Sequence, residues 1–157
     1  MEIKNRSLIW HGMFLFLLGL ISGFVEQKFI NPRMGLAAHL EGVMLGTFLV
    51  ALGAVWTYVK LSSRMKAIAY WTALYSAYVN WATTALAAAL GTAALSPITG
   101  AGHHAQPGRE TLITALFMSV GIATVASTLL ILWGLRAGAA KDEKLEQKKT
   151  TSSAGGR

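Results

Sequence analysis

The chain has 157 residues, of which 54% are hydrophobic and 13% charged, and its formal net charge is +7. Soluble domains usually carry about 25% charged residues, so this composition indicates a membrane protein. The absence of cysteine excludes disulfides, iron–sulfur clusters and thiolate-ligated haem. The basic residues lie in short flanks and a tail instead of along one folded face, so nucleic-acid binding is not indicated.

Mainly apolar runs, each long enough to cross a bilayer as a helix, organise the chain. The first follows a short basic segment, but it is longer than a signal-peptide core and ends without a clear cleavage site, so we expect it to be retained. We therefore predict an all-α membrane domain over residues 1–140, built as a four-helix bundle, and a polar, disordered tail over residues 141–157. The four predicted spans are residues 8–25, 36–59, 67–90 and 111–135.

The distribution of lysine and arginine predicts the orientation of the bundle. Eleven of the 14 lie at the N-terminus, in the link between the second and third runs, or in the tail; the others are Lys28, Arg33 and Arg109. Because cytoplasmic loops are enriched in Lys and Arg, both termini are expected in the cytoplasm. Aromatic residues at the predicted cytoplasmic ends agree, since such rings favour the headgroup layer. These residues are Trp10, Trp56, Tyr58, Tyr70, Trp71 and Trp133.

The second run contains the most unusual polar residues. His39 and Glu41 lie just inside the apolar sequence, where a histidine or glutamate is costly unless it is paired, ligated or hydrated. Gly42 and Gly46 share the helical face of His39. They indicate either close helix packing or room for a flat ligand bound by His39. Glu41 lies about 200° around the helix from His39, where it could pair with Arg33 or a neighbouring subunit.

The other histidines have less specific interpretations. His11 begins the first run at its cytoplasmic end, most of a bilayer thickness away from His39. A haem with both histidines as axial ligands in one protomer is therefore disfavoured, and we expect His11 to be a hydrogen-bonded interfacial residue. His103 and His104 lie in a loop rich in Gly, Ala and Pro, where solvation is expected.

A polar stripe follows the third run. Thr72, Ser76, Asn80 and Thr84 recur every four residues and therefore share one helical face. Such residues ordinarily form hydrogen bonds between membrane helices, and they can also form the wall of a polar pocket. Because the third run is directed outward, Asn80 and Thr84 are expected in the same half of the bilayer as His39.

The residues alone leave enzyme, transporter and structural subunit open. Several segments resemble the hydroxylaminobenzene mutase family, small membrane enzymes that rearrange hydroxylaminobenzene to 2-aminophenol. The resemblance covers roughly residues 7–136 and is most specific in NPRMGLAAHLEG. The same sequence is similar, more distantly, to styrene oxide isomerase, a four-span haem protein. The segments are WHGMFLFLLGLISG, NPRMGLAAHLEGVMLGTFLV, YVNWATTALAA and LILWGLR, which begin at residues 10, 31, 78 and 130.

The resemblance to styrene oxide isomerase implies specific residue roles. There a histidine matching His39 is the axial haem ligand, and an asparagine matches Asn80. Two positions differ, because that enzyme has a substrate-binding asparagine in place of Leu45 and a tyrosine in place of Thr84. The epoxide chemistry is therefore not carried over.

These resemblances imply a membrane isomerase that converts arylhydroxylamines to 2-aminophenols, with ferric haem b as a Lewis acid. The alternatives are an aryl epoxide isomerase and a non-enzymatic membrane subunit or small transporter. We expect a small aromatic substrate that enters from the lipid. We also expect a homotrimer, located in the bacterial inner membrane. The expected site residues are His39, Gly42 and Gly46 for the cofactor, with His39 on the iron, and Asn80, Thr84 and Glu41 for substrate orientation and proton transfer.

Overall fold

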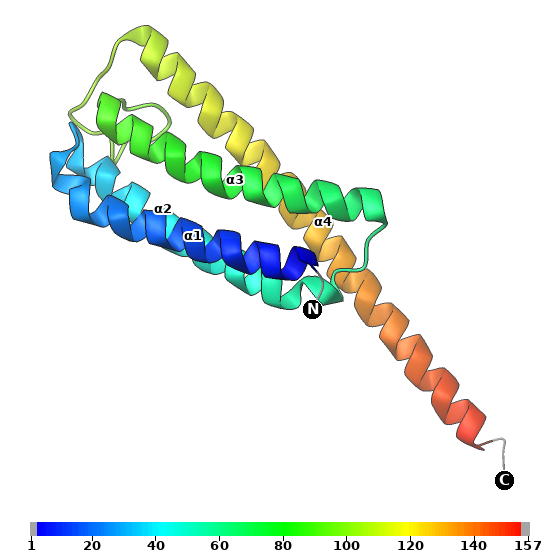
Figure 1. Cartoon of the computed structure of the whole chain (residues 1–157). Coiled ribbons are helices and arrows are strands. Elements are labelled where there is room, and N and C mark those ends of the chain that lie inside the picture. Colours follow the sequence, from blue (N-terminus) through cyan, green and yellow to red (C-terminus); the bar gives the residue numbers. More distant parts are fainter. Residues whose placement is uncertain (1–2, 155–157) are drawn as a thin grey trace.

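The computed structural model describes residues 3–154, with side chains for residues 4–138. Within that part every secondary-structure element is a helix, and α1, α2 and α3 lie side by side while α4 crosses the bundle and extends beyond it (Figure 1). The backbone of α4 includes the predicted tail as far as Ala154, and the disorder of that tail stays a prediction. The helices are α1 (Ile3–Val25), α2 (Pro32–Val55), α3 (Ser63–Leu90) and α4 (Pro107–Ala154), with 3₁₀ turns η1 (Glu26–Lys28) and η2 (Trp56–Tyr58).

Each helix begins before its predicted apolar run, and polar capping residues start α2 and α3. The side chain of Asn31 accepts a hydrogen bond from the Met34 amide at 3.2 Å, and Pro32 opens α2. Asparagine is a favoured N-cap, and proline fits the first helical turn, where its missing N–H costs nothing. At the other end of α3, Gly91 adopts a left-handed φ of 65° and terminates the helix.

Among the residues that the structure describes, three helical stretches are long and apolar enough to cross a membrane: Lys4–Lys28, Pro32–Tyr58 and Pro107–Gly138. The predicted all-α membrane fold is thereby confirmed, whereas hydropathy supports three of the four predicted spans. The third predicted span, α3, is long enough at 28 residues but contains many Tyr, Thr and Ser residues and Asn80. It packs between α2 and α4 and contributes much of the core.

Close packing of α1 on α2 depends on glycine. A Cβ on Gly19 would lie 2.7 Å from the carbonyl carbon of Gly42, and one on Gly46 would lie 2.7 Å from the carbonyl oxygen of Gly12. Small residues allow membrane helices to approach in this way. Gly42 and Gly46 therefore serve helix packing, and α1 occupies the space that we expected to accommodate a flat cofactor.

Two residues of the predicted aromatic belt are instead part of the core. Trp56 is 0% and Tyr70 is 6% exposed, and their rings contact edge to face at 6.2 Å between centroids. They close the end of the bundle where η2 leads toward α3, with the ammonium groups of Lys66 and Lys4 above their rings. The other four belt residues are exposed: Trp10, Tyr58, Trp71 and Trp133.

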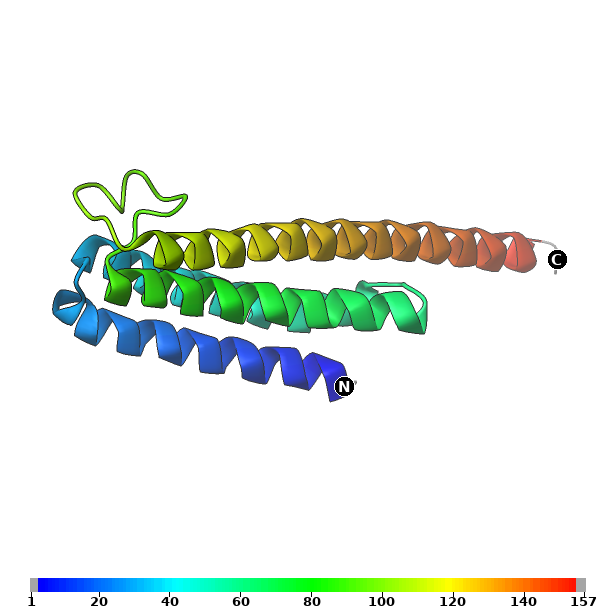
Figure 2. The same cartoon turned by 90° about the horizontal axis from the view of Figure 1, so that it is seen from above.

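The long loop of residues 91–106 lies at the opposite end of the bundle from the start of α1 and the α2–α3 link (Figure 2). The side-chain amide of buried Asn31 donates to the Thr99 carbonyl at 2.8 Å. The carboxylate of Glu110 accepts from the amides of Ala93 and Ala105. These contacts fasten the loop to α2 and α4.

His103 is also part of this fastening, and the expectation that it is solvated is wrong. Its Nε2 donates to the carbonyl oxygen of Ile30 at 3.1 Å, and its Nδ1 is buried. The loop folds back over the turn between α1 and α2, which leaves this ring half-buried and shields its Nδ1 from solvent. His104 is exposed, as expected.

Candidate functional site

The imidazole of His39 is oriented by a hydrogen bond to α1. Its Nδ1 lies 2.8 Å from the carbonyl oxygen of Gly19. A carbonyl oxygen can only accept, so Nδ1 carries the proton and donates. The lone pair of the neutral ring is therefore on Nε2, the arrangement found where a histidine binds a metal through one nitrogen and is oriented through the other.

A gap in α1 accommodates the imidazole. Gly23 lies against the ring, and a Cβ there would be 2.7 Å from Nδ1 and 3.1 Å from Cε1. Gly19 and Gly23 thus form two sides of one support for His39. In the sequence, this support for His39 is visible only as two glycines four positions apart in the first apolar run. Its connection to His39 required the register between α1 and α2, which the sequence does not supply.

His39 lines a pocket of about 330 Å³ between α1 and α2. The pocket lies near the loop end of the bundle, and among its lining residues only His39 and Glu26 have ionisable side chains. The other lining residues are Leu20, Gly23, Phe24 and Leu36. A free imidazole nitrogen bordered by apolar side chains fits an axial bond to a haem.

A second polar group lies between α2 and α3. The hydroxyl of Thr84 is 2.7 Å from a carboxylate oxygen of Glu41 and 3.0 Å from the backbone carbonyl of Asn80. The side chain of Asn80 is a further hydrogen-bond partner of Glu41. Within one chain Glu41 thus meets α3 instead of Arg33, and the alternative of a neighbouring subunit stays a prediction. We call Glu41, Asn80 and Thr84 the carboxyl cluster.

The rest of the α3 polar stripe does not reach another helix through hydroxyl groups. Thr72 donates to the carbonyl of Ile68, and Ser76 donates to that of Ala73, both within α3. This is the usual local bonding of Ser and Thr in helices. Only the Asn80–Thr84 end of the stripe therefore combines with a residue of α2.

The two polar sites lie on opposite sides of α2. His39 contacts Gly19 and Gly23 of α1, whereas Glu41 contacts Thr84 of α3. The two side chains meet different helices because, as predicted, they point in different directions around α2. The structure thus brings together the three residues expected for orientation and proton transfer, and within one chain it leaves His39 outside their cluster.

His11 ties α1 to α3. The hydroxyl of Tyr78 donates to the backbone carbonyl of His11 at 3.1 Å, so its oxygen accepts from the His11 Nδ1 at 3.1 Å. A second tie runs from Trp81 Nε1 to the hydroxyl of Ser22 at 3.1 Å. His11 and His39 have separate surroundings, which agrees with the expectation that they do not share a cofactor.

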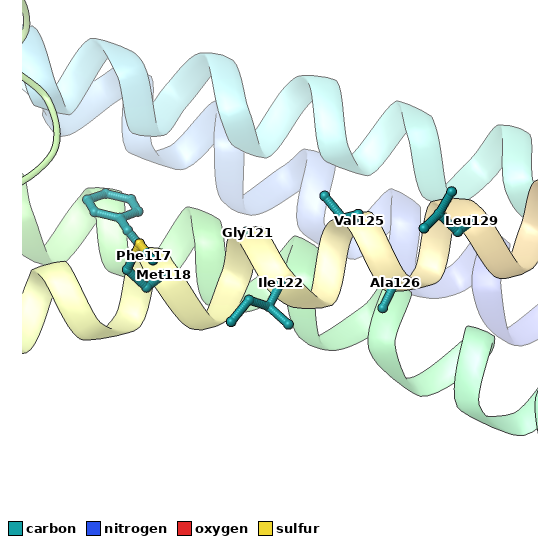
Figure 3. Close-up of a pocket in the computed structure, with 7 residues that line it drawn as sticks. All are labelled: Phe117, Met118, Gly121, Ile122, Val125, Ala126 and Leu129. Atoms are coloured by element: carbon teal, nitrogen blue, oxygen red, sulfur yellow. The ribbon is translucent and has the colours of Figure 1, made fainter.

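A larger apolar pocket of about 540 Å³ follows the outer face of α4 (Figure 3). All of its lining residues come from α4 and none is ionisable, so it is suited to lipid or to another apolar helix. These residues are Phe117, Met118, Gly121, Ile122, Val125, Ala126 and Leu129. Among the described residues, no three His, Cys, Asp or Glu side chains gather into a metal-ion site.

Comparison with known proteins places this architecture among enzymes. A family model described as styrene oxide isomerase matches residues 4–136. Hydroxylaminobenzene mutase HabB of Ectopseudomonas oleovorans is 39% identical over 137 residues, which cover 87% of this chain and 84% of HabB. Hydroxylaminobenzene mutase HabA of the same organism is 37% identical over 125 residues, covering 79% of this chain and 93% of HabA. No solved structure matches the chain.

The matches and the apolar helices together define a membrane enzyme of the isomerase and mutase class. Its residues 4–136 span nearly the whole helical bundle. The chain belongs to the styrene oxide isomerase family.

Proposed function

We propose that this enzyme rearranges arylhydroxylamines of the hydroxylaminobenzene type to 2-aminophenols in the bacterial inner membrane. The names of the two relatives support this substrate class. The structural observation that carries the proposal is the His39 imidazole, whose Nδ1 is committed to Gly19 and whose Nε2 is free beside an apolar pocket. Such a pocket suits an apolar aromatic substrate that enters from lipid.

His39 is the proposed axial ligand of haem b. When bound, ferric haem would supply a Lewis acid. The Gly19 carbonyl keeps the His39 ring in one tautomer, while Leu20, Phe24 and Leu36 line the apolar part of the pocket beside it. Gly42 and Gly46 contribute indirectly, because they hold α2 against the helix that orients the ring.

The carboxyl cluster is the proposed proton-transfer group. The rearrangement breaks the N–O bond, forms a C–O bond at the ortho carbon and transfers the proton of that carbon to the nitrogen, so overall composition is unchanged. The single hydroxyl proton of Thr84 faces two acceptor oxygens, at 2.7 and 3.0 Å. A protonated Glu41 carboxyl satisfies both contacts, which supports Glu41 as a proton donor. Asn80 is placed to orient the polar group of the substrate.

We propose that the complete site forms between subunits of a homotrimer. His39 and the carboxyl cluster face opposite sides of α2, so a neighbouring copy can bring one against the other. The exposed apolar face of α4 offers a surface for such contacts (Figure 3). The trimeric number rests on the resemblance to styrene oxide isomerase.

The proposed topology has four spans and cytoplasmic termini. Because α3 runs beside α2 for most of its length (Figure 1), it crosses the bilayer with α2 despite its polar residues. The neighbouring helices cover those residues: Ser76, Thr83 and Thr84 are buried. Eleven of the 14 basic residues then lie on the cytoplasmic side.

An aryl epoxide isomerase is the second candidate function. The match to the styrene oxide isomerase model over residues 4–136 favours it. Leu45 and Thr84 argue against it, since by the resemblance styrene oxide isomerase has a substrate-binding asparagine at the first position and a tyrosine at the second. Assays of one preparation with hydroxylaminobenzene and with styrene oxide separate the two functions.

The proposal is tested by the absorption spectrum of detergent-purified protein, followed by assay for 2-aminophenol. We expect a Soret band of b-type haem in the parent protein and in His11→Ala, and loss of both the band and the activity in His39→Ala. His11 is a matched control because it also has its Nδ1 in a hydrogen bond to another helix. A normal spectrum and normal product formation in His39→Ala would refute the assignment.

A further inference from the structure

The His39 pocket contains one ionisable side chain that the proposed mechanism does not use. Glu26 lines this pocket together with His39, and every other lining residue is apolar or glycine. The residues from α1 and η1 follow one another at helical spacing, because Gly23, which contacts the His39 ring, precedes Glu26 by three positions. The carboxylate and the imidazole therefore border the same apolar space.

The position of Glu26 is fixed by its backbone. Its carbonyl accepts a hydrogen bond from the Phe29 amide at 3.2 Å within the turn. The turn also packs closely on α2, since a Cβ on Gly35 would lie 3.0 Å from the Glu26 carbonyl oxygen. Glu26 is half-buried, and one carboxylate oxygen accepts from the side chain of Gln27 at 3.3 Å. The turn therefore holds this side chain at the pocket.

We propose that Glu26 is a charge-tuning residue that keeps iron bound at His39 in the ferric state. The inference rests on the proposed haem site. A half-buried anionic side chain at the edge of an apolar pocket attracts Fe³⁺ more strongly than Fe²⁺, and nearby charge and burial set the potential of haem iron. Ferric iron is also the stronger Lewis acid. Lys28 and Arg33, the nearby cations along the chain, are exposed, so solvent and salt screen their opposing effect.

The test is a spectroscopic redox titration of the detergent-solubilised holoprotein, which measures the midpoint potential independently of turnover. Glu26→Gln removes the charge and keeps the size and a hydrogen-bonding group, so its midpoint potential should shift to a more positive value. Glu26→Asp keeps the charge and should titrate close to the parent protein. Gln27→Ala is the matched control, because it removes the side-chain partner of Glu26 and leaves the carboxylate in place.

The outcomes separate this inference from the proposed function. A parent protein without a Soret band would reject the haem site itself. If the parent has a Soret band that depends on His39 while Glu26→Gln keeps the parent potential, only the tuning role is rejected. Loss of haem from Glu26→Gln would also overturn it, since Glu26 would then hold the cofactor instead of adjusting its potential. An equal shift in Glu26→Gln and Gln27→Ala would show that the turn, and not the charge, sets the potential.

Discussion

His39 donates a hydrogen bond from Nδ1 to the carbonyl oxygen of Gly19 on the neighbouring helix, at 2.8 Å. Four residues later, Gly23 leaves the space in which the same ring lies. Because α1 both orients the ring and makes room for it, the packing of α1 on α2 determines where the free Nε2 is presented. The glycines of α1 therefore belong to the functional site although they have no side chain.

Replacement of Gly23 by alanine should displace the imidazole. The new Cβ would be 2.7 Å from Nδ1, so the ring must rotate or α1 must move away. Loss of such an orienting arrangement typically lowers metal affinity by about 10- to 100-fold, and overpacking costs about 1–3 kcal/mol. Haem retention through size-exclusion chromatography and the thermal midpoint measure the two effects.

Gly108→Ala is the matched control for this substitution. It also replaces a glycine in a helix, but no atom lies within 4 Å of its added Cβ. Alanine is favoured over glycine inside a helix by about 0.5–1 kcal/mol, so Gly108→Ala should keep haem and be at least as stable as the parent. Equal haem loss in both variants would show that Gly23 has no special relation to His39.

Replacement of Glu41 by glutamine should slow the rearrangement while the Soret band persists. General acid catalysis typically contributes about 10²–10⁴-fold, and glutamine keeps the shape of the side chain without a transferable proton. Thr84→Val should cause a smaller loss of rate and cost about 1–3 kcal/mol in stability, because the half-buried carboxyl group loses its partner at 2.7 Å.

Thr47→Val provides the comparison for Thr84→Val. Thr47 is exposed on α2, and its hydroxyl bonds only to the Val43 carbonyl of its own helix. Initial rates of 2-aminophenol formation at saturating substrate should therefore be unchanged in Thr47→Val. A Glu41→Gln enzyme with the parent rate would remove Glu41 from the proposed proton transfer.

The sequence predicted elements and faces well, and contacts between helices less well. Apolar run length located all four helices, and helical spacing correctly separated His39 from Glu41. Helical spacing does not show which neighbouring helix each of these side chains contacts, because that depends on how the helices are arranged in the bundle. The sequence did not show that Gly42 and Gly46 pack against another helix. Their packing role became visible only in the structure, where Gly19 and Gly12 lie against them.

Residues at the ends of helices were harder to predict. Trp56 and Tyr70 have the composition of an interfacial belt, yet η2 turns Trp56 inward against α3. His103 lies in a sequence typical of a solvated loop, but that loop folds back onto Ile30. In both cases a chain reversal covers the side chain, fully for Trp56 and partly for His103, and periodicity within a helix contains no information about reversals.

Removal of the Tyr78 hydroxyl should loosen α1 from α3 without releasing haem. Tyr78→Phe leaves the His11 Nδ1 proton and a backbone carbonyl without their partner, which costs about 1–3 kcal/mol where these groups are shielded from water. We expect a lower thermal midpoint and an unchanged Soret band. Tyr75→Phe is a suitable comparison, because its exposed hydroxyl links to Ser119 of α4. Haem loss confined to Tyr78→Phe would place the His11 contact within the cofactor site.

The last prediction concerns α3, which hydropathy alone does not identify as a span. If α3 crosses the membrane beside α2, reporters fused to the two ends of the chain should both be cytoplasmic, and a reporter inserted at exposed Gly102 should lie on the opposite side. The distribution of basic residues requires this result, since Lys60, Arg64 and Lys66 would otherwise share a side with the loop. The glycine position is suitable because its φ of 85° and open surroundings place it at a loop surface. A three-span protein would instead put the two termini on opposite sides. That result would also move the Asn80–Thr84 end of α3 out of the bilayer, and the carboxyl cluster could no longer act in an apolar site.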